Sequence, residues 1–73
     1  HQDANLHAGI LGHGAKVAWR NPEGRHVWIQ VASGRVKVNE RELAAGDGAW
    51  TSESGDLLFE GLEKAELLLF DLA

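Results

Sequence analysis

Apolar residues in this chain alternate with polar ones at a period of two, in short segments separated by glycine-rich turns. Residues 25–32 show the pattern best, because Val27, Ile29 and Val31 all lie on one side of that segment. A period of two is that of a pleated strand. Nine glycines and one proline supply the turns that must separate such strands. We therefore expect an all-β chain with no helix beyond a single turn.

The same reasoning places further strands along the chain. They are expected at residues 5–11, 15–20, 35–38, 57–59 and 67–72, with short pieces around residues 43 and 49–50. Residues 67–72 are apolar on both sides, which is typical of a strand that is covered on both faces. Good helix formers across residues 62–70 leave a helix open there, but the β surroundings favour a strand. Strands at this spacing are typical of an antiparallel sandwich or barrel.

The size and charge of the chain limit its class. It has 73 residues and no cysteine, so it forms one small domain that no disulfide can stabilise. Stability must come from a metal, from association, or from the rest of a larger protein. A net charge of −4 with scattered cations argues against a nucleic-acid partner. No basic leader precedes an apolar stretch, and no apolar run approaches the roughly 20 residues of a membrane span, so we expect a cytoplasmic protein.

A resemblance to a known family rests on segments that recur in order over nearly the whole chain. These segments are His1-Gln2-Asp3-Ala4, Val27-Trp28-Ile29-Gln30-Val31 leading to Gly34, Asn39, Leu43, Ala45-Gly46-Asp47-Gly48-Ala49 and residues 65–72. The chain resembles the C-terminal cupin lobe of the pirin-like bicupins, a family that includes bacterial quercetin 2,3-dioxygenases. The resemblance implies a small antiparallel β-barrel of the cupin type, with jelly-roll topology, over residues 1–73. It also implies a separate N-terminal lobe that holds the catalytic metal.

The resemblance implies the positions at which a metal-bearing cupin has its metal ligands, and this chain has no ligating residue at those positions. The family pattern is His-x-His on one strand, a Glu shortly after, and a third His beyond the Gly-Asp turn. This chain has no His-x-His, places Val27 at about the Glu position, and has no histidine in residues 52–58. We therefore expect no metal, no cofactor and no catalytic residue in this lobe.

Other candidate chemistry is weaker. A rearranged metal site could combine His1, His7 and His13 with Asp3, but these residues fall on different elements, and ligands must converge. His26 is the remaining histidine, and surface positions are expected for all four.

The remaining polar motifs fit solvent and turn chemistry. The pairs Glu40 with Glu42 and Glu63 with Glu66 fit solvated faces. Gly46-Asp47-Gly48 is too short for a phosphate loop and places an acid where the anion would sit.

Interaction with another protein is the leading functional hypothesis. Trp19 and Trp50 are expected in the core, whereas Trp28 lies opposite the valine side of its strand and is either an interface anchor or covered by a terminal segment. The candidate interface comprises Trp28, Gln30, Leu67 and Leu69. The expected partner is a second copy, giving a homodimer, or a metal-bearing cupin lobe.

The alternative hypothesis places a ligand or dioxygenase chemistry inside the barrel. Its apolar interior would be formed by Val27, Ile29, Val31, Val36 and Val38, and it would take a small apolar or flavonoid-like ligand. Side chains usually fill so small a barrel, so we favour the interaction module.

Overall fold

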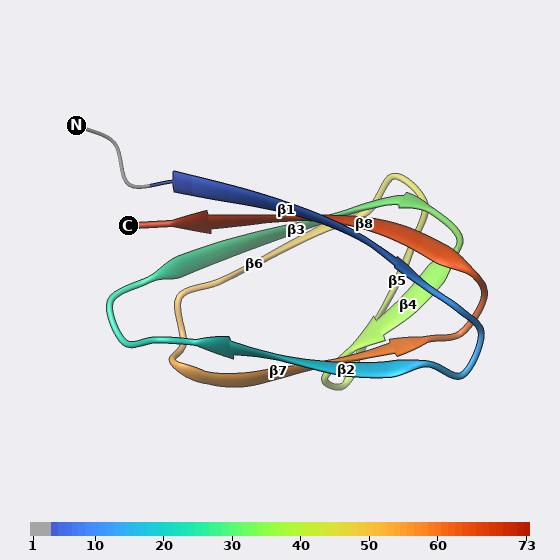
Figure 1. Ribbon diagram of the computed structural model, residues 1–73, viewed down its shortest axis with the longest axis horizontal. Coiled ribbons are helices and arrows are strands. Elements are labelled where there is room, and N and C mark those ends of the chain that lie inside the picture. The colour runs from blue at the N-terminus through green and yellow to red at the C-terminus, as the bar shows by residue number, and fades with distance from the viewer. Residues whose placement is uncertain (1–3) are drawn as a thin grey trace.

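The computed structural model describes residues 4–73, and these residues form strands joined by turns, without a helix (Figure 1). The eight strands are β1 (Ala4–Leu11), β2 (Lys16–Asn21), β3 (His26–Ser33), β4 (Arg35–Val38), β5 (Arg41–Ala44), β6 (Gly48–Thr51), β7 (Gly55–Gly61) and β8 (Ala65–Leu72). The expectation of an all-β fold is confirmed, and residues 65–72 form a strand rather than a helix.

The strands form two antiparallel sheets packed face to face. Sheet A has the order β1-β8-β3-β6, and sheet B has the order β2-β7-β4-β5. Figure 1 shows the chain crossing between the two layers at successive connections, with the β4–β5 hairpin as the exception. This alternation between two four-stranded sheets is the jelly-roll arrangement.

The two sheets are not closed into a continuous barrel. Strands β1 and β2 are edge strands of different sheets, and each pairs with a single neighbour, β8 and β7 respectively. The expected cupin-type jelly roll is confirmed, and its two sheets form an open sandwich.

The core lies between the inner faces of the two sheets. Its buried apolar residues are Leu11, Val27, Ile29, Val31, Val36, Val38, Leu43, Leu57, Phe59, Ala65 and Leu69. The valine side of β3 faces inward, as its alternation predicts, and Val36 and Val38 of β4 face it from sheet B. Trp19 packs against this cluster from the edge strand β2, as expected.

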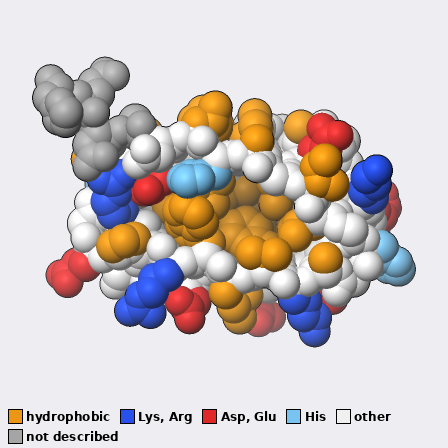
Figure 2. Space-filling view, in the orientation of Figure 1, with side chains coloured by type: hydrophobic (Ala, Val, Ile, Leu, Met, Phe, Trp, Pro, Cys, Tyr) orange, Lys and Arg blue, Asp and Glu red, His pale blue; other side chains and the backbone are white. Residues whose placement is uncertain are grey.

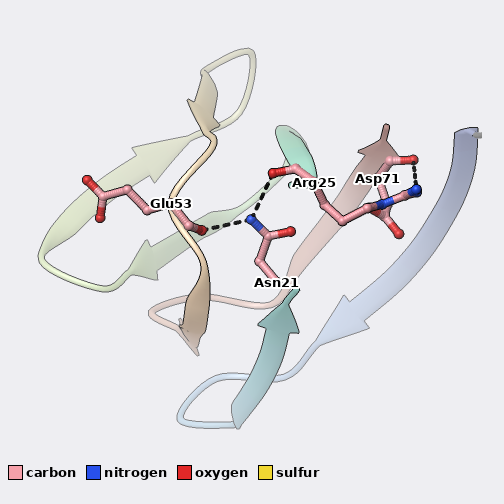
Figure 3. Close-up of polar contacts among 4 residues, drawn as sticks. All are labelled: Asn21, Arg25, Glu53 and Asp71. Carbon is pink, nitrogen blue, oxygen red and sulfur yellow. Dashed lines mark hydrogen bonds and ion pairs between the residues drawn. The ribbon is translucent and has the colours of Figure 1, made fainter. Parts of the chain in front are cut away.

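Polar contacts close the end of the sandwich at which β2 passes into β3 (Figure 3). Asn21 is fully buried, and its Nδ2 donates to the backbone oxygens of Arg25 (3.3 Å) and Glu53 (2.8 Å). The guanidinium of Arg25 then donates through Nε to Oδ1 of Asp71, 3.0 Å away. Both side chains of this ion pair are largely buried. The turn, the loop before β7 and the end of β8 are thus joined by one buried amide and one ion pair.

Removal of the Asn21 amide should destabilise the whole fold. The substitution Asn21→Ala removes a fully buried amide and leaves two part-buried hydrogen bonds unmade, and we expect a loss of about 1–3 kcal/mol in the free energy of unfolding. Urea titration of both proteins measures the difference. Asn5→Ala on the exposed part of β1 is the matched control and should change stability little. Equal effects of the two substitutions would contradict the assignment.

Gly34 is required at the β3–β4 connection for two separate reasons. Its φ is +76°, and a Cβ at this position would overlap the carbonyl oxygen of Lys64. Gly46 has a similar φ of +91°, but a Cβ there would meet no atom within 4 Å. We expect Gly34→Ala to cost about 1–3 kcal/mol more than Gly46→Ala, because only the first adds overlap to the strain of a positive φ. Thermal or urea unfolding compares the two variants. Equal losses of stability would show that the backbone at Lys64 moves to make room for the added Cβ.

Candidate functional site

The outer face of sheet A is apolar across the sheet. Strand β3 sends Val27, Ile29 and Val31 inward, so the residues between them face outward, and cross-strand pairing extends this assignment to β8, β1 and β6. We call this surface the apolar face; it comprises Leu6, Ala8, Ile10, Trp28, Ala32, Trp50, Leu68, Phe70 and Leu72, and the polar residues Gln30 and Glu66 lie on the same side. Several members are strongly exposed, including Leu6 at 59% and Ile10 at 65%.

Two tryptophans lie opposite each other on this face. Trp28 of β3 pairs with Trp50 of β6 and is 37% exposed, which confirms its expected outward position. Its ring covers Gly48, where a Cβ would overlap the indole. Trp50 is 53% exposed, so its expected place in the core is wrong. The His26 ring stacks on Trp50 with centroids 5.4 Å apart and planes 8° from parallel.

The face assigned to two of the expected interface residues is corrected. Leu67 and Leu69 pair with Val31 and Ile29, which places both leucines on the inner side of sheet A. Leu69 is 7% exposed and belongs to the core. The β8 residues that face outward are Leu68, Phe70 and Leu72. Because both sides of this strand are apolar, the sequence alone could not show which side faces the core.

Gln30 does lie on the outer side with Trp28, and its Nε2 donates to the backbone oxygen of Asp47, 3.0 Å away. Sequence reasoning missed Leu6, Ile10 and Phe70 as members of the same surface. Leu6 and Phe70 lie opposite each other on β1 and β8, and Ile10 lies on the same side of β1 opposite Glu66, so the pairing of the two strands identifies them.

Sheet B presents the opposite character on its outer face. Charged residues alternate along β2, β4 and β7, and opposite charges face each other across strands. Arg20 lies 3.5 Å from Asp56, and Lys37 pairs in register with Glu60. Leu58 is an isolated large apolar residue on this face, opposite Ala18. Sheet B thus has the polar, solvent-exposed outer face that is usual for an antiparallel sheet, whereas sheet A does not.

An apolar pocket opens between the sheets at the edge strands β1 and β2. Figure 2 shows the molecule hollowed there, with hydrophobic side chains lining the hollow. The pocket has a volume of about 280 Å³, and its lining includes Leu11, Trp19, Ile29, Phe59 and Leu69. At its rim the ring of His7 meets that of Trp19 edge-on, with centroids 4.7 Å apart.

The five residues expected to form an apolar pocket are placed mainly in the core. Val27, Val31 and Val36 are sealed between the sheets. Ile29 reaches the pocket between β1 and β2, and with Val38 it also borders a smaller one near β6.

The positions that hold metal ligands in a metal-bearing cupin do not fit a metal here. Val27 is fully buried among apolar neighbours. Among the described residues there is no group of three or more His, Cys, Asp or Glu side chains that could hold a metal ion. His13 lies in the exposed turn after β1, whereas His7 contacts Trp19. His1 and Asp3, also considered as ligands, lie outside the described residues.

The remaining polar motifs serve the local structure. Glu42 and Glu63 both form ion pairs with Arg35 at the surface of sheet B. Asp47 caps its own turn, because its Oδ2 accepts from the backbone nitrogen of Ala44 at 2.9 Å. The segment around Asp47 is therefore a turn, and its carboxylate is already engaged with the backbone.

The fold and its neighbours define the class of protein as cupin. The structure superposes on the Cupin_2 domain of an XRE family transcriptional regulator from Enterobacter cloacae with a TM-score of 0.80 at 17% identity, covering 96% of this chain and 81% of that one. The family model described as quercetinase C-terminal cupin domain matches residues 1–72. The chain therefore belongs to the family of quercetinase C-terminal cupin domains, found in pirin-like proteins.

Solved structures agree with this assignment. The bacterial pirin YhhW from Escherichia coli, in complex with nickel(II), superposes with a TM-score of 0.94 at 30% identity over 99% of this chain. A second structure of the same protein gives a TM-score of 0.95. The chain spans 31% of the length of that pirin. Comparison with curated protein sequences gave no match. Residues 4–73 contain no helix able to cross a membrane.

Proposed function

We propose that this chain is a non-catalytic cupin lobe that serves as an interaction module. Its apolar face packs against another cupin lobe, which is either a metal-bearing lobe or a second copy of this chain. The observation that carries the proposal is the contrast between the two outer faces. Sheet B covers its outer face with cross-strand ion pairs, whereas sheet A presents aromatic and aliphatic side chains to solvent.

The apolar face has the properties of a buried surface. Its exposed members come from β1, β3 and β6, and its partly buried members on β8 lie between β1 and β3, so the surface extends across the whole sheet. Large contiguous apolar patches are rare on soluble monomers. The two tryptophans near its β6 side supply large, rigid rings of the kind that anchor interfaces.

The comparison with E. coli pirin supports a companion lobe as the partner. That protein was solved with nickel(II), and the part matched by this chain is 31% of it. Because the described residues of this chain lack a convergent ligand set, we propose that the metal of such a protein is bound by the remaining part. The lobe described here would then support the metal-bearing lobe mechanically through the apolar face.

The isolated chain should associate through the apolar face. Burying the Trp28 indole contributes on the order of 2 kcal/mol by area, so Trp28→Ala should weaken self-association by roughly tenfold or more. A charge at the most exposed position of the face, in Ile10→Glu, should abolish it. Analytical ultracentrifugation over micromolar concentrations measures the dissociation constants.

The matched control for these variants is Leu58→Ala, which removes an apolar side chain that is 57% exposed from the outer face of sheet B. It should leave association unchanged. A wild-type chain that stays monomeric at the highest concentration would rule out a second copy as the partner, and a Leu58→Ala variant that dissociates as readily as Trp28→Ala would count against the proposed surface.

The isolated lobe should bind no metal in its interior and should not oxidise quercetin. After equilibration with nickel(II) or iron(II) and dialysis, elemental analysis should find far less than one ion per chain. Residual binding should be lost in His13→Ala, because His13 is exposed at a turn. One retained ion per chain that survives this substitution, or metal-dependent quercetin turnover above a protein-free control, would refute the non-catalytic assignment.

A further inference from the structure

Among the edge strands of the described residues, β1 is the one without protection against pairing. The two sheets end in four edge strands, which are β1, β6, β2 and β5. Proteins protect such edges with charged side chains, prolines, inward-pointing charges or short strands. Strand β2 has Lys16 and Arg20, and β6 has only four residues. Strand β5 also has four residues and turns Arg41 to the inner side, opposite the buried Val38. Strand β1 has eight residues without Asp, Glu, Lys, Arg or Pro.

The direction of the backbone groups in β1 follows from the hydrogen bonds of β3. The N–H of Val31 donates to the backbone oxygen of Asp47, and its C=O accepts from the nitrogen of Gly46, so both groups point toward β6. Hydrogen-bonded pairs alternate with non-hydrogen-bonded pairs along antiparallel strands. The neighbouring residue Gln30 therefore bonds in the other direction, with its β8 partner Leu68.

The same alternation extends to β1. Because Leu68 bonds with β3, Leu69 turns its backbone groups the other way and bonds with its β1 partner His7. The residues on either side of His7 then point their N–H and C=O groups away from β8, toward the open edge of sheet A. The backbone groups at this edge are those of Leu6, Ala8 and Ile10.

These backbone groups are complementary to those of a second β1 strand that runs antiparallel. With Ala8 of each copy at a two-fold axis, Leu6 forms a hydrogen-bonded pair with Ile10 of the second copy. On the inner side of the sheet, His7 then lies opposite Gly9 of the second copy, where a Cβ would meet no atom within 4 Å. An axis at His7 would set two histidine rings against each other, and an axis at Gly9 would leave two glycines opposite each other. The register centred on Ala8 therefore gives the best fit.

The apolar pocket between the sheets opens along the same edge. Its β1 side includes His7, Gly9 and Leu11, and Figure 2 shows its hydrophobic lining open to the outside. In the pairing centred on Ala8, β1 of the second copy lies across this opening, and its His7 side chain reaches the space beside Gly9. One partner thus satisfies the backbone edge and covers the apolar hollow.

Charge does not oppose this pairing, although each copy carries a net charge of −4. Strand spacing and rise place Glu66 of β8 about 20 Å from Glu66 of the second copy, well beyond the Debye length of about 8 Å at physiological ionic strength. Asp71, the other acidic residue of β8, is in an ion pair with Arg25. Pairing of β2 with its own copy would instead bring Lys16 and Arg20 together, so we expect sheet B to end at β2.

We propose that two copies of this chain pair through the open edge of β1, antiparallel and with Ala8 at the two-fold axis, so that sheet A continues from one copy into the other. The contact is made by backbone groups at the edge. It therefore does not rest on the face packing proposed above, although the side chains of Leu6, Ala8 and Ile10 belong to the apolar face. The two apolar faces then lie on the same side of one continuous sheet.

Amide hydrogen exchange followed by nitrogen-15 NMR distinguishes edge pairing from face packing. The measurement uses the Trp28→Ala chain, in which the proposed face packing is weakened, and compares dilute protein with protein at concentrations up to about 1 mM. On concentration, exchange at the amides of Leu6, Ala8 and Ile10 should slow roughly fivefold or more, because these amides gain hydrogen bonds. The amides of the residues between them should change little, because they already bond with β8.

Cysteine cross-linking tests the register, because the chain has no cysteine of its own. Ala8→Cys should form a disulfide-linked dimer roughly tenfold faster or more than the control Leu58→Cys, because pairing holds the two thiols at a high effective concentration. Leu58 is exposed on the outer face of sheet B. Leu6→Cys alone should link no faster than this control. A mixture of the Leu6→Cys and Ile10→Cys chains should link as fast as Ala8→Cys, because these two positions pair.

Three results would overturn the edge pairing. They are a Trp28→Ala chain that stays monomeric at the highest concentration, amide protection that does not alternate along β1, or Ala8→Cys chains that link no faster than the control. If Ala8→Cys does not fold, the exchange pattern and the mixture of Leu6→Cys with Ile10→Cys decide. A monomeric Trp28→Ala chain beside an associating wild type would leave the face packing standing. Association that Trp28→Ala does not weaken, with alternating protection in β1, would refute face packing between copies and support the edge pairing.

Discussion

The register of β3 is the constraint on which the rest of the structure depends. Val27, Ile29 and Val31 alternate along this strand, and their burial fixes which side of it faces sheet B. Because β3 lies between β8 and β6, the same choice orients both neighbours and, through β8, the edge strand β1. A slip of one residue would exchange the two faces of the strand. The core, the apolar face and the inner pocket are therefore consequences of one alternating row.

The sequence predicts those features that a single strand determines by itself. The alternation of residues 25–32 predicts β3 correctly, and the five further strands listed with it are expected close to their observed positions. The faces of β8 could not be predicted, because both sides of it are apolar and only pairing with β3 orients them. Trp50 was misplaced because its segment is too short for a period to be read. The pocket could not be predicted, because part of its space is left by the missing side chain of Gly9 and is visible only once the two sheets are in place.

Sheet A therefore carries two surfaces of similar chemistry and different shape. Its outer side is broad and open, which suits another protein surface, while its inner side is narrowed by sheet B to a slot between β1 and β2. The buried contacts of Asn21 and Arg25 hold the sheets together at the far end of β2. The sandwich is therefore joined by buried polar contacts at one end and has an open pocket at the edge between β1 and β2.

The position of β8 has a consequence for how the lobe is made. The last strand of the chain lies between β1, the first, and β3. Until residues 65–72 leave the ribosome, β1 has no partner and one edge of β3 is unpaired, although most of sheet B can already form. Pairing of the first strand with the last has the highest sequence separation in the fold, and such pairings are slow to form. The apolar face is therefore completed only once β8 has been made, because this strand joins β1 to the rest of sheet A.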